Sequence, residues 1–193
     1  MSHTTRRSLL IATAGIAMAG GAAAQAAPRV KFVTSMGEFV VEVYSDKAPK
    51  TAENFLQYVR DKHYDGTIFH RVMSDFMVQG GGMDANLREK PTRAPIQHEG
   101  RAAMAAGLRN TVGMLAMART PDPHSATSQF FINVVNNGML DPGVREPWGY
   151  TVFGKVVSGM DTVEKIRRVP TRSQRGHDDV PTTPVTITSA TLQ

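Results

Sequence analysis

The amino-acid sequence predicts one mainly β domain, an antiparallel barrel or sandwich with two helices packed against it. Short apolar runs recur along the chain and are separated by Gly, Pro, Asn and Asp, which is typical of antiparallel strands joined by turns. In contrast, only two segments place apolar residues at helical spacing. Since no internal repeat or low-complexity stretch interrupts this pattern, we expect a single domain.

The first predicted elements are a hairpin and a helix. Strands at 30–34 and 38–44 flank a Ser-Met-Gly turn, in which glycine supplies the unusual backbone angle. Asp46 then stands as a candidate N-cap, and Pro49 falls in the first helical turn. The apolar stripe that follows predicts an amphipathic helix over about 48–61.

The rest of the chain is predicted to form mostly short strands. A second helix is expected over 160–168, after a glycine and with Asp161 in its first turn. The segment 84–109 is predicted to be mostly loop and the segment 169–184 to be a polar, proline-containing connection, and neither has the composition of a domain linker. The remaining strand candidates are 67–72, 76–79, 96–98, 112–118, 129–134, 152–156 and 185–192.

Residues 1–26 are predicted to be a cleavable export signal that precedes a domain of residues 27–193. An Arg6-Arg7 pair stands before an uncharged run rich in Leu, Ile, Ala and Gly, as in the n- and h-regions of such signals. The run is too short and too weakly apolar for a stable membrane-spanning helix, although a permanent N-terminal anchor is the alternative. Small residues place cleavage before Ala27, with cleavage after Ala24 as a second choice.

The arginine pair also resembles the twin-arginine export signal of bacteria. Ile11 stands where that signal usually has a polar or basic residue, so the general secretory route remains the alternative. Both routes deliver the chain outside the cytoplasm, and we expect a periplasmic protein with no stable membrane association after cleavage.

Composition excludes several functions. The signal contains two of the 22 basic residues and no acidic one, so the remaining domain has a net charge of +3 that is spread along the chain. No basic run is interleaved with aromatic residues, and we therefore expect no nucleic-acid partner. The chain has no cysteine, which excludes disulfides and thiol chemistry. The histidines are scattered, so no metal site is predicted, and no Gly-x-Ser-x-Gly motif indicates a serine hydrolase.

Several longer motifs occur in order along the domain. Residues 69–81 read FHRVMSDFMVQGG, and they are followed by GMLAMA at 113–118, SATSQFFI at 125–132, a Leu-Asp pair at 140–141 and VFGKV at 152–156. Together these motifs resemble the cyclophilin family of peptidyl-prolyl cis-trans isomerases. The resemblance implies a closed antiparallel eight-stranded β-barrel with two α-helices packed at its ends. It also implies an isomerase that needs no cofactor.

Isomerisation of an X–Pro bond makes simple chemical demands. Amide resonance gives the bond a rotation barrier of about 20 kcal/mol, and no bond is broken when it rotates. The site must hold the proline ring in an apolar pocket and favour the twisted amide, whose nitrogen has regained its lone pair. A guanidinium can stabilise that state electrostatically. The resemblance places the catalytic arginine at Arg71, although an isolated arginine would be read as a surface or salt-bridged residue.

The resemblance also assigns the other site residues. Gln79 is expected to hydrogen-bond the substrate backbone or to steady Arg71. Strand alternation puts Phe76 on the face opposite Gln79, so a bend near Ser74 is needed to bring both into one site. His70 is interpreted as structural. The apolar wall and peptide groove are assigned to Phe76, Met77, Ala118, Gln129, Phe131, Met139, Leu140 and Tyr150, of which the Phe, Met and Leu residues could equally be plain core.

These patterns support one leading function and two alternatives. The leading interpretation is an isomerase that acts on proline-containing peptides and on unfolded or folding exported proteins, and we expect it to be a monomer. The first alternative is a cyclophilin-like binding module or chaperone without catalysis. The second is a barrel that carries a small apolar ligand, which would explain the strands but not Arg71 together with Gln79.

Two positions lead to a prediction about inhibition. Met139 and Tyr150 stand where well-known eukaryotic cyclophilins have tryptophan and histidine. Tyrosine keeps an apolar ring with a polar tip, whereas methionine lacks the indole N–H donor. We therefore expect weak binding of the macrocyclic inhibitor cyclosporin. A calorimetric titration checks this expectation, and a nanomolar Kd would contradict it.

Overall fold

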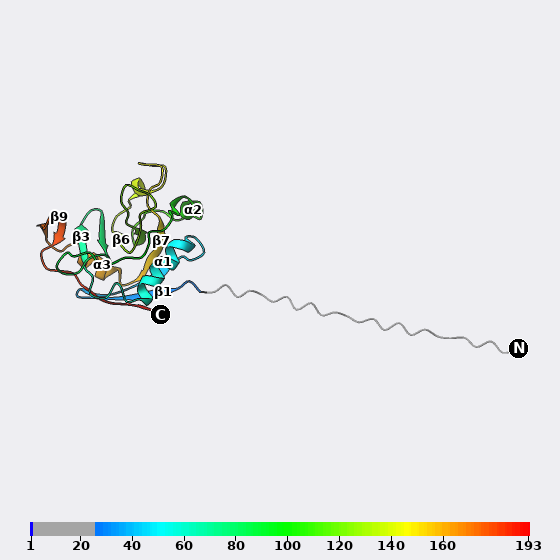
Figure 1. The fold of residues 1–193 in the computed structure, drawn as a ribbon, viewed down its shortest axis with the longest axis horizontal. Coiled ribbons are helices and arrows are strands. Elements are labelled where there is room, and N and C mark those ends of the chain that lie inside the picture. The colour runs from blue at the N-terminus through cyan, green and yellow to red at the C-terminus, as the bar shows by residue number, and fades with distance from the viewer. Residues whose placement is uncertain (2–25) are drawn as a thin grey trace.

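A computed structural model describes Met1 and residues 26–193, and its main feature is one curled antiparallel sheet (Figure 1). The strands follow the spatial order β10-β1-β2-β7-β5-β6-β4-β3. The predicted mainly β class is therefore confirmed. The strands of this sheet are β1 (Arg29–Thr34), β2 (Gly37–Val43), β3 (Phe69–Met73), β4 (Met77–Gly80), β5 (Met114–Met117), β6 (Phe130–Asn133), β7 (Val152–Ser158) and β10 (Ile187–Leu192).

The sheet is not a continuous ring of paired strands. Its edge strands, β3 and β10, are joined only near their starts, by an isolated bridge between Ile68 and Thr186. Next to this bridge the amide of Phe69 donates to the carbonyl of Val185 at 2.9 Å. Within the described residues, the expected closure of the barrel is thus limited to a short contact between the two edges.

An aromatic cluster fills the concave side of the sheet. Phe32 and Phe39, paired across β1 and β2, stack with ring centroids 4.9 Å apart. Phe130 from β6 and Phe153 from β7 contact the ring of Phe55, which comes from a helix. All five rings are buried. Burial of large aromatic side chains is a main source of stability in a domain without disulfides.

Three α-helices are present in the described part of the chain, one more than predicted. α1 (Pro49–Arg60) and α3 (Met160–Ile166) are the two expected helices. α2 (Gly100–Ala105) lies in the segment 84–109, for which no helix is predicted from the sequence. With six residues and a glycine at its start, α2 is too short to produce a periodic apolar pattern.

Two further expectations about strands were wrong. The candidate strand 96–98 is only a single bridge between Ile96 and Ala126. The segment 169–184, predicted to be a loop, contains a separate hairpin of β8 (Thr171–Gln174) and β9 (His177–Pro181). Its strands are mostly exposed and polar, so they lack the apolar alternation by which strands are predicted.

The described residues contain no helix of the length and apolar character needed to cross a bilayer. The predicted export signal lies almost entirely outside the described residues, and the arginine pair with it.

The start of α1 is capped by a residue distant in sequence. Ala48, not Asp46, is the N-cap residue, and it makes no side-chain capping bond. Instead the carboxylate of Glu99 accepts hydrogen bonds from the amides of Lys50 at 3.1 Å and Thr51 at 2.8 Å. Because the first amides of a helix have no partner within the helix, this carboxylate replaces a local cap.

We expect Glu99→Ala to lower the free energy of unfolding by about 1–2 kcal/mol, the usual cost of losing a helix cap. Urea denaturation measures this difference. Asp46→Ala is the matched control and should change stability by less than about 0.5 kcal/mol. Equal losses for the two variants would contradict the role of Glu99.

Candidate active site

Strand register brings three of the predicted site residues into one row. Arg71 on β3 lies opposite Gln79 on β4, and Gln79 lies opposite Phe131 on β6. Side chains at directly opposed positions of antiparallel strands are neighbours on the same face of the sheet. Residues separated by 60 positions of sequence are therefore placed side by side by hydrogen-bonded pairing.

A β-bulge decides which way Arg71 points. Phe69 is paired with Gly80 and Arg71 with Gln79, so His70 is an extra residue on β3. In a regular strand Phe69 and Arg71 would lie on the same face. Here they pair with two consecutive residues, Gly80 and Gln79, and therefore lie on different faces. Phe69 is accordingly buried in the core, while the Arg71 side chain is 44% exposed.

A cavity of about 180 Å³ lies over this row. Eight of the ten predicted site residues border it. Gln129 and Met139 do not, and Met139 is half exposed. The lining residues are Arg71, Phe76, Met77, Gln79, Ala118, Arg119, Phe131, Leu140 and Tyr150.

Phe76 reaches the cavity from a turn. The amide of Phe76 donates to the carbonyl of Met73 at 3.1 Å, which closes the turn between β3 and β4. β4 begins one residue later, at Met77. The bend that alternation required is therefore present, and Phe76 and Met77 contribute to the same cavity.

The opposite wall consists of aromatic and aliphatic side chains held by the loop after β6. The rings of Phe131 and Tyr150 meet edge to face, with centroids 5.6 Å apart. Leu140 is buried in a short 3-10 helix (Gly138–Leu140), and its carbonyl accepts a hydrogen bond from the amide of Tyr150 at 2.9 Å. The two residues thus form one connected wall.

Gln129 lies beside the cavity rather than in it. Its side-chain oxygen accepts a hydrogen bond from the Gln79 amide at 3.0 Å. It borders a second, more polar hollow of about 540 Å³ that shares Gln79, Ala118 and Arg119 with the first cavity. A chain bound in the small cavity has room to continue along this hollow.

On its outer side, Arg71 faces the hairpin β8–β9. Its Nε lies 3.9 Å from a carboxylate oxygen of Asp179, a contact at the limit of an ion pair. His70 is buried next to this hairpin, and burial, followed by the charge of His177, lowers the pKa of His70 to about 4. His70 is thus neutral at ordinary pH. In the described residues no group of acidic or histidine side chains is arranged to hold a metal ion.

A buried chain of amides supports both walls of the cavity. Asn137 donates through its side chain to the carbonyl of Phe76 and to the side-chain oxygen of Asn133, each at 2.8 Å. Asn133 donates to Asn110 at 3.2 Å, and Asn110 donates to the carboxylate of Asp141 at 2.8 Å. The network therefore begins at Phe76 and ends at the residue after Leu140. Buried polar groups need such partners, so the network ties the two walls together.

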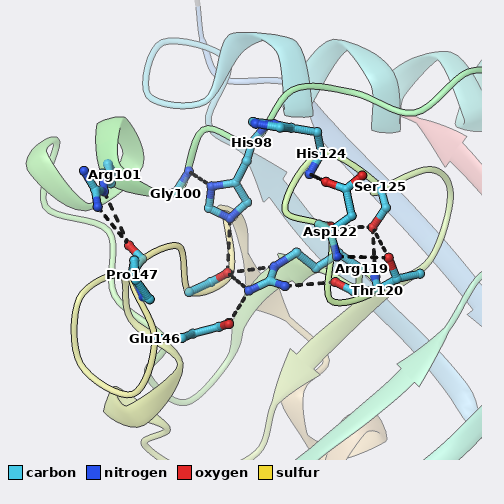
Figure 2. A network of polar contacts seen from close by, with 11 residues as sticks. His98, Gly100, Arg101, Arg119, Thr120, Asp122, His124, Ser125, Glu146 and Pro147 are labelled. Carbon is cyan, nitrogen blue, oxygen red and sulfur yellow. Dashed lines mark hydrogen bonds and ion pairs between the residues drawn. The ribbon is translucent and has the colours of Figure 1, made fainter.

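Arg119 is the cavity residue that sequence reasoning missed. Its side chain is only 4% exposed and is held in a network of polar contacts with backbone carbonyls and Glu146 (Figure 2). The one available signal was its place directly after Ala118, at the end of a motif that had already been assigned to the groove.

Comparison with known proteins shows the family of the chain. A sequence model of the family described as "Cyclophilin type peptidyl-prolyl cis-trans isomerase/CLD" matches residues 29–192. The chain belongs to this family, which confirms both the expected family and the expected enzyme class, a peptidyl-prolyl isomerase.

Two bacterial relatives have high sequence identity to this chain. The chain is 55% identical to peptidyl-prolyl cis-trans isomerase cyp18 of Streptomyces antibioticus, over 84% of this chain and 97% of the relative. It is 49% identical to peptidyl-prolyl cis-trans isomerase B of Escherichia coli, over 84% and 98%. Among solved structures, a cyclophilin-type isomerase of Cryptosporidium parvum has the same fold, with a TM-score of 0.69 and 24% identity over 86% of this chain and 98% of that one.

We expect Asn137→Ala to lower both stability and activity. The change leaves the side-chain oxygen of Asn133 without its donor and removes one of the two hydrogen bonds to the Phe76 carbonyl, so the free energy of unfolding should fall by about 1–3 kcal/mol. The catalytic efficiency kcat/KM toward a proline peptide should fall about tenfold at a temperature where the variant is folded. Asn136→Ala is the matched control, because Asn136 is exposed and accepts only the amide of Val112. A variant with unchanged kcat/KM would contradict the positioning role of Asn137.

Proposed function

We propose that this chain accelerates the cis-trans isomerisation of X–Pro bonds in exported polypeptides, without a covalent intermediate. The observation that carries this proposal is that the guanidinium of Arg71 and the amide of Gln79 border the same small cavity as a set of apolar side chains. That combination fits a reaction in which an apolar ring is held still while a neighbouring amide is twisted and stabilised.

In this mechanism the proline ring occupies the apolar part of the cavity, against Phe76, Met77, Phe131 and Leu140. Arg71 stands at one side of the cavity and supplies a guanidinium, which carries only hydrogen-bond donors. As the bond rotates, the proline nitrogen regains its lone pair and becomes a hydrogen-bond acceptor for the guanidinium. Each tenfold acceleration requires about 1.4 kcal/mol of stabilisation that is specific to the twisted state.

The remaining predicted residues would bind the flanking chain. Gln79 would hydrogen-bond the substrate backbone, and its bond to Gln129 would orient its amide. Ala118 leaves space between the two hollows because its side chain is small. Tyr150 would contact the proline ring, and Met139, which is half exposed, would contact residues beyond it.

We further propose that residues 1–26 direct export to the bacterial periplasm and that residues 27–193 are the isomerase domain. The family match begins at residue 29 and β1 begins at Arg29, so both start just beyond the proposed cleavage site. The clients would then be proline-containing exported proteins during folding.

The bridge between Ile68 and Thr186 supports the closed form of the barrel, which we also propose. We further propose that the domain acts as a monomer.

The competing function is a peptide-binding module without catalysis. Such a module would need the apolar walls but not a guanidinium beside them. The presence of Arg71 opposite Gln79 therefore favours the enzyme.

We expect Arg71→Ala to reduce kcat/KM for a short proline peptide by about 10²- to 10³-fold, the range for losing one electrostatic stabiliser. Exchange NMR measures the rate at equilibrium. Arg60→Ala is the control, because Arg60 lies on α1 and pairs with Glu53 away from the cavity. A wild-type protein that does not accelerate isomerisation would refute the enzyme, and an unaffected Arg71→Ala variant would refute the role of Arg71.

A further inference from the structure

One backbone carbonyl next to the proline cavity accepts an unusual number of hydrogen bonds. The carbonyl of Gly149 accepts from Nε of Arg119 at 3.0 Å and from Nη2 of the same guanidinium at 2.8 Å. It also contacts Nε2 of His98 at 3.1 Å (Figure 2). Gly149 directly precedes Tyr150, so this carbonyl belongs to the peptide unit that leads into the cavity wall.

Arg119 is built into the structure rather than exposed to solvent. Besides its bonds to Gly149, its Nη1 donates to the carbonyl of Thr120 at 2.9 Å, and the guanidinium forms an ion pair with Glu146. The guanidinium centre also lies 4.6 Å from the ring centroid of Tyr150. A charge this deeply buried is tolerated only when its donors are satisfied, so its position is well defined. Arg119 thus contacts both the ring of Tyr150 and the carbonyl of the residue that precedes it.

The hydrogen bonds of His98 define its protonation state. The amide of Gly100 donates to Nδ1 at 3.1 Å, so Nδ1 carries no proton. The proton is therefore on Nε2, where it is donated to the carbonyl of Gly149. Burial lowers the pKa of His98, against the opposing effect of its bond to Gly149. The neighbouring charges of Arg119 and His124 act in the same direction as burial, and Glu146 opposes them.

The segment that carries Gly149 is also packed closely against the rest of the cavity wall. Gly149 has a φ of 58°, and a Cβ atom there would lie 2.4 Å from the nitrogen of Pro142 and 2.6 Å from the carbonyl oxygen of Leu140. That same Leu140 carbonyl accepts the amide of Tyr150. A displacement of Gly149 is therefore transmitted to both Leu140 and Tyr150.

From this geometry we propose that Arg119 and His98 are positioning residues. Together they hold the Gly149 carbonyl and thereby set the placement of Tyr150 and Leu140, two residues of the same wall of the proline cavity. This inference rests on the proposed function, because it assigns the cavity to the proline ring. Neither residue acts on the rotating bond. They affect how tightly the proline ring is bound, so their substitution should change the Kd of the substrate.

The test uses the full domain and compares Arg119→Met with Arg119→Lys. Methionine keeps the long apolar stem but none of the hydrogen bonds, and lysine keeps the charge but not the planar fork. For Arg119→Met we expect the Kd of a short Ala-Pro tetrapeptide, measured by NMR titration, to rise about 5- to 20-fold, with kcat at saturating peptide changing less than twofold. Such a split identifies lost binding common to the substrate and the transition state. Arg119→Lys should fall between the wild type and Arg119→Met.

Trp148 supplies a separate signature of the same loop. It is the only tryptophan of the chain and precedes Gly149. Its ring meets those of His98 and His124 edge to face, with centroids 5.8 Å and 5.3 Å apart. Trp148 is already 39% exposed, and we expect Arg119→Met to shift its emission further toward longer wavelength, because release of Gly149 exposes more of the ring to water. His98→Ala should cause a shift in the same direction and a smaller rise in Kd.

Arg167→Gln is the matched control. Arg167 is a partly buried arginine that also donates to a backbone carbonyl, that of Val134 at 2.9 Å, and also pairs with a glutamate, but it does not border the cavity. It should lose a comparable amount of stability and leave the Kd and the Trp148 emission unchanged. The proposal is overturned if Arg119→Met behaves like Arg167→Gln, or if it lowers kcat while the Kd stays constant.

The experiment distinguishes failure of this inference from failure of the proposed catalysis. If the wild-type domain bound the peptide without isomerising it, the proposed catalysis would fail. The Kd and the Trp148 emission would still decide whether Arg119 and His98 hold the cavity wall.

Discussion

Hydrogen-bonded register between β3, β4 and β6 is the constraint on which the rest of the site depends. It places Arg71, Gln79 and Phe131 in a row across three strands. The bulge at His70 then turns the Arg71 side chain away from the core, while Phe69 stays in it. Since side chains alternate with a period of two, a strand without this extra residue would put Arg71 on the same face as Phe69, toward the core. The charge would then be buried and the cavity would lose it.

Polar contacts hold an apolar cavity in shape. Much of the cavity lining is apolar, and apolar contact is not directional. Their placement comes from directional bonds behind them. Asn137 binds the Phe76 turn, and the amide chain continues to Asp141 beside Leu140. On the other side Arg119 binds the peptide that leads into Tyr150. Both supports use buried polar groups. Displacement of either support would leave a buried partner without its hydrogen bond, and the free energy that this costs keeps the walls in place.

The differences between prediction and structure share a physical cause. The regular strands and α1 were predictable because they bury an apolar face with a clear period. α2 and the hairpin β8–β9 were missed because they are short or mostly exposed. Capping of α1 by Glu99 could not be predicted either, since the partner comes from a segment about 50 residues away rather than from the helix's own start.

By itself, the sequence determined the strand pattern, the family and eight residues of the cavity. Seven of those residues sit within motifs whose order along the chain is specific, and Tyr150 lies two residues before the last motif, so no distance was needed to assign them. The tertiary structure alone decided that Phe76 joins the site through a turn, that Gln129 lies beside the cavity, and that Arg119 supports it. The reason is that these roles depend on contacts between residues far apart in sequence, and neither local periodicity nor composition encodes such contacts.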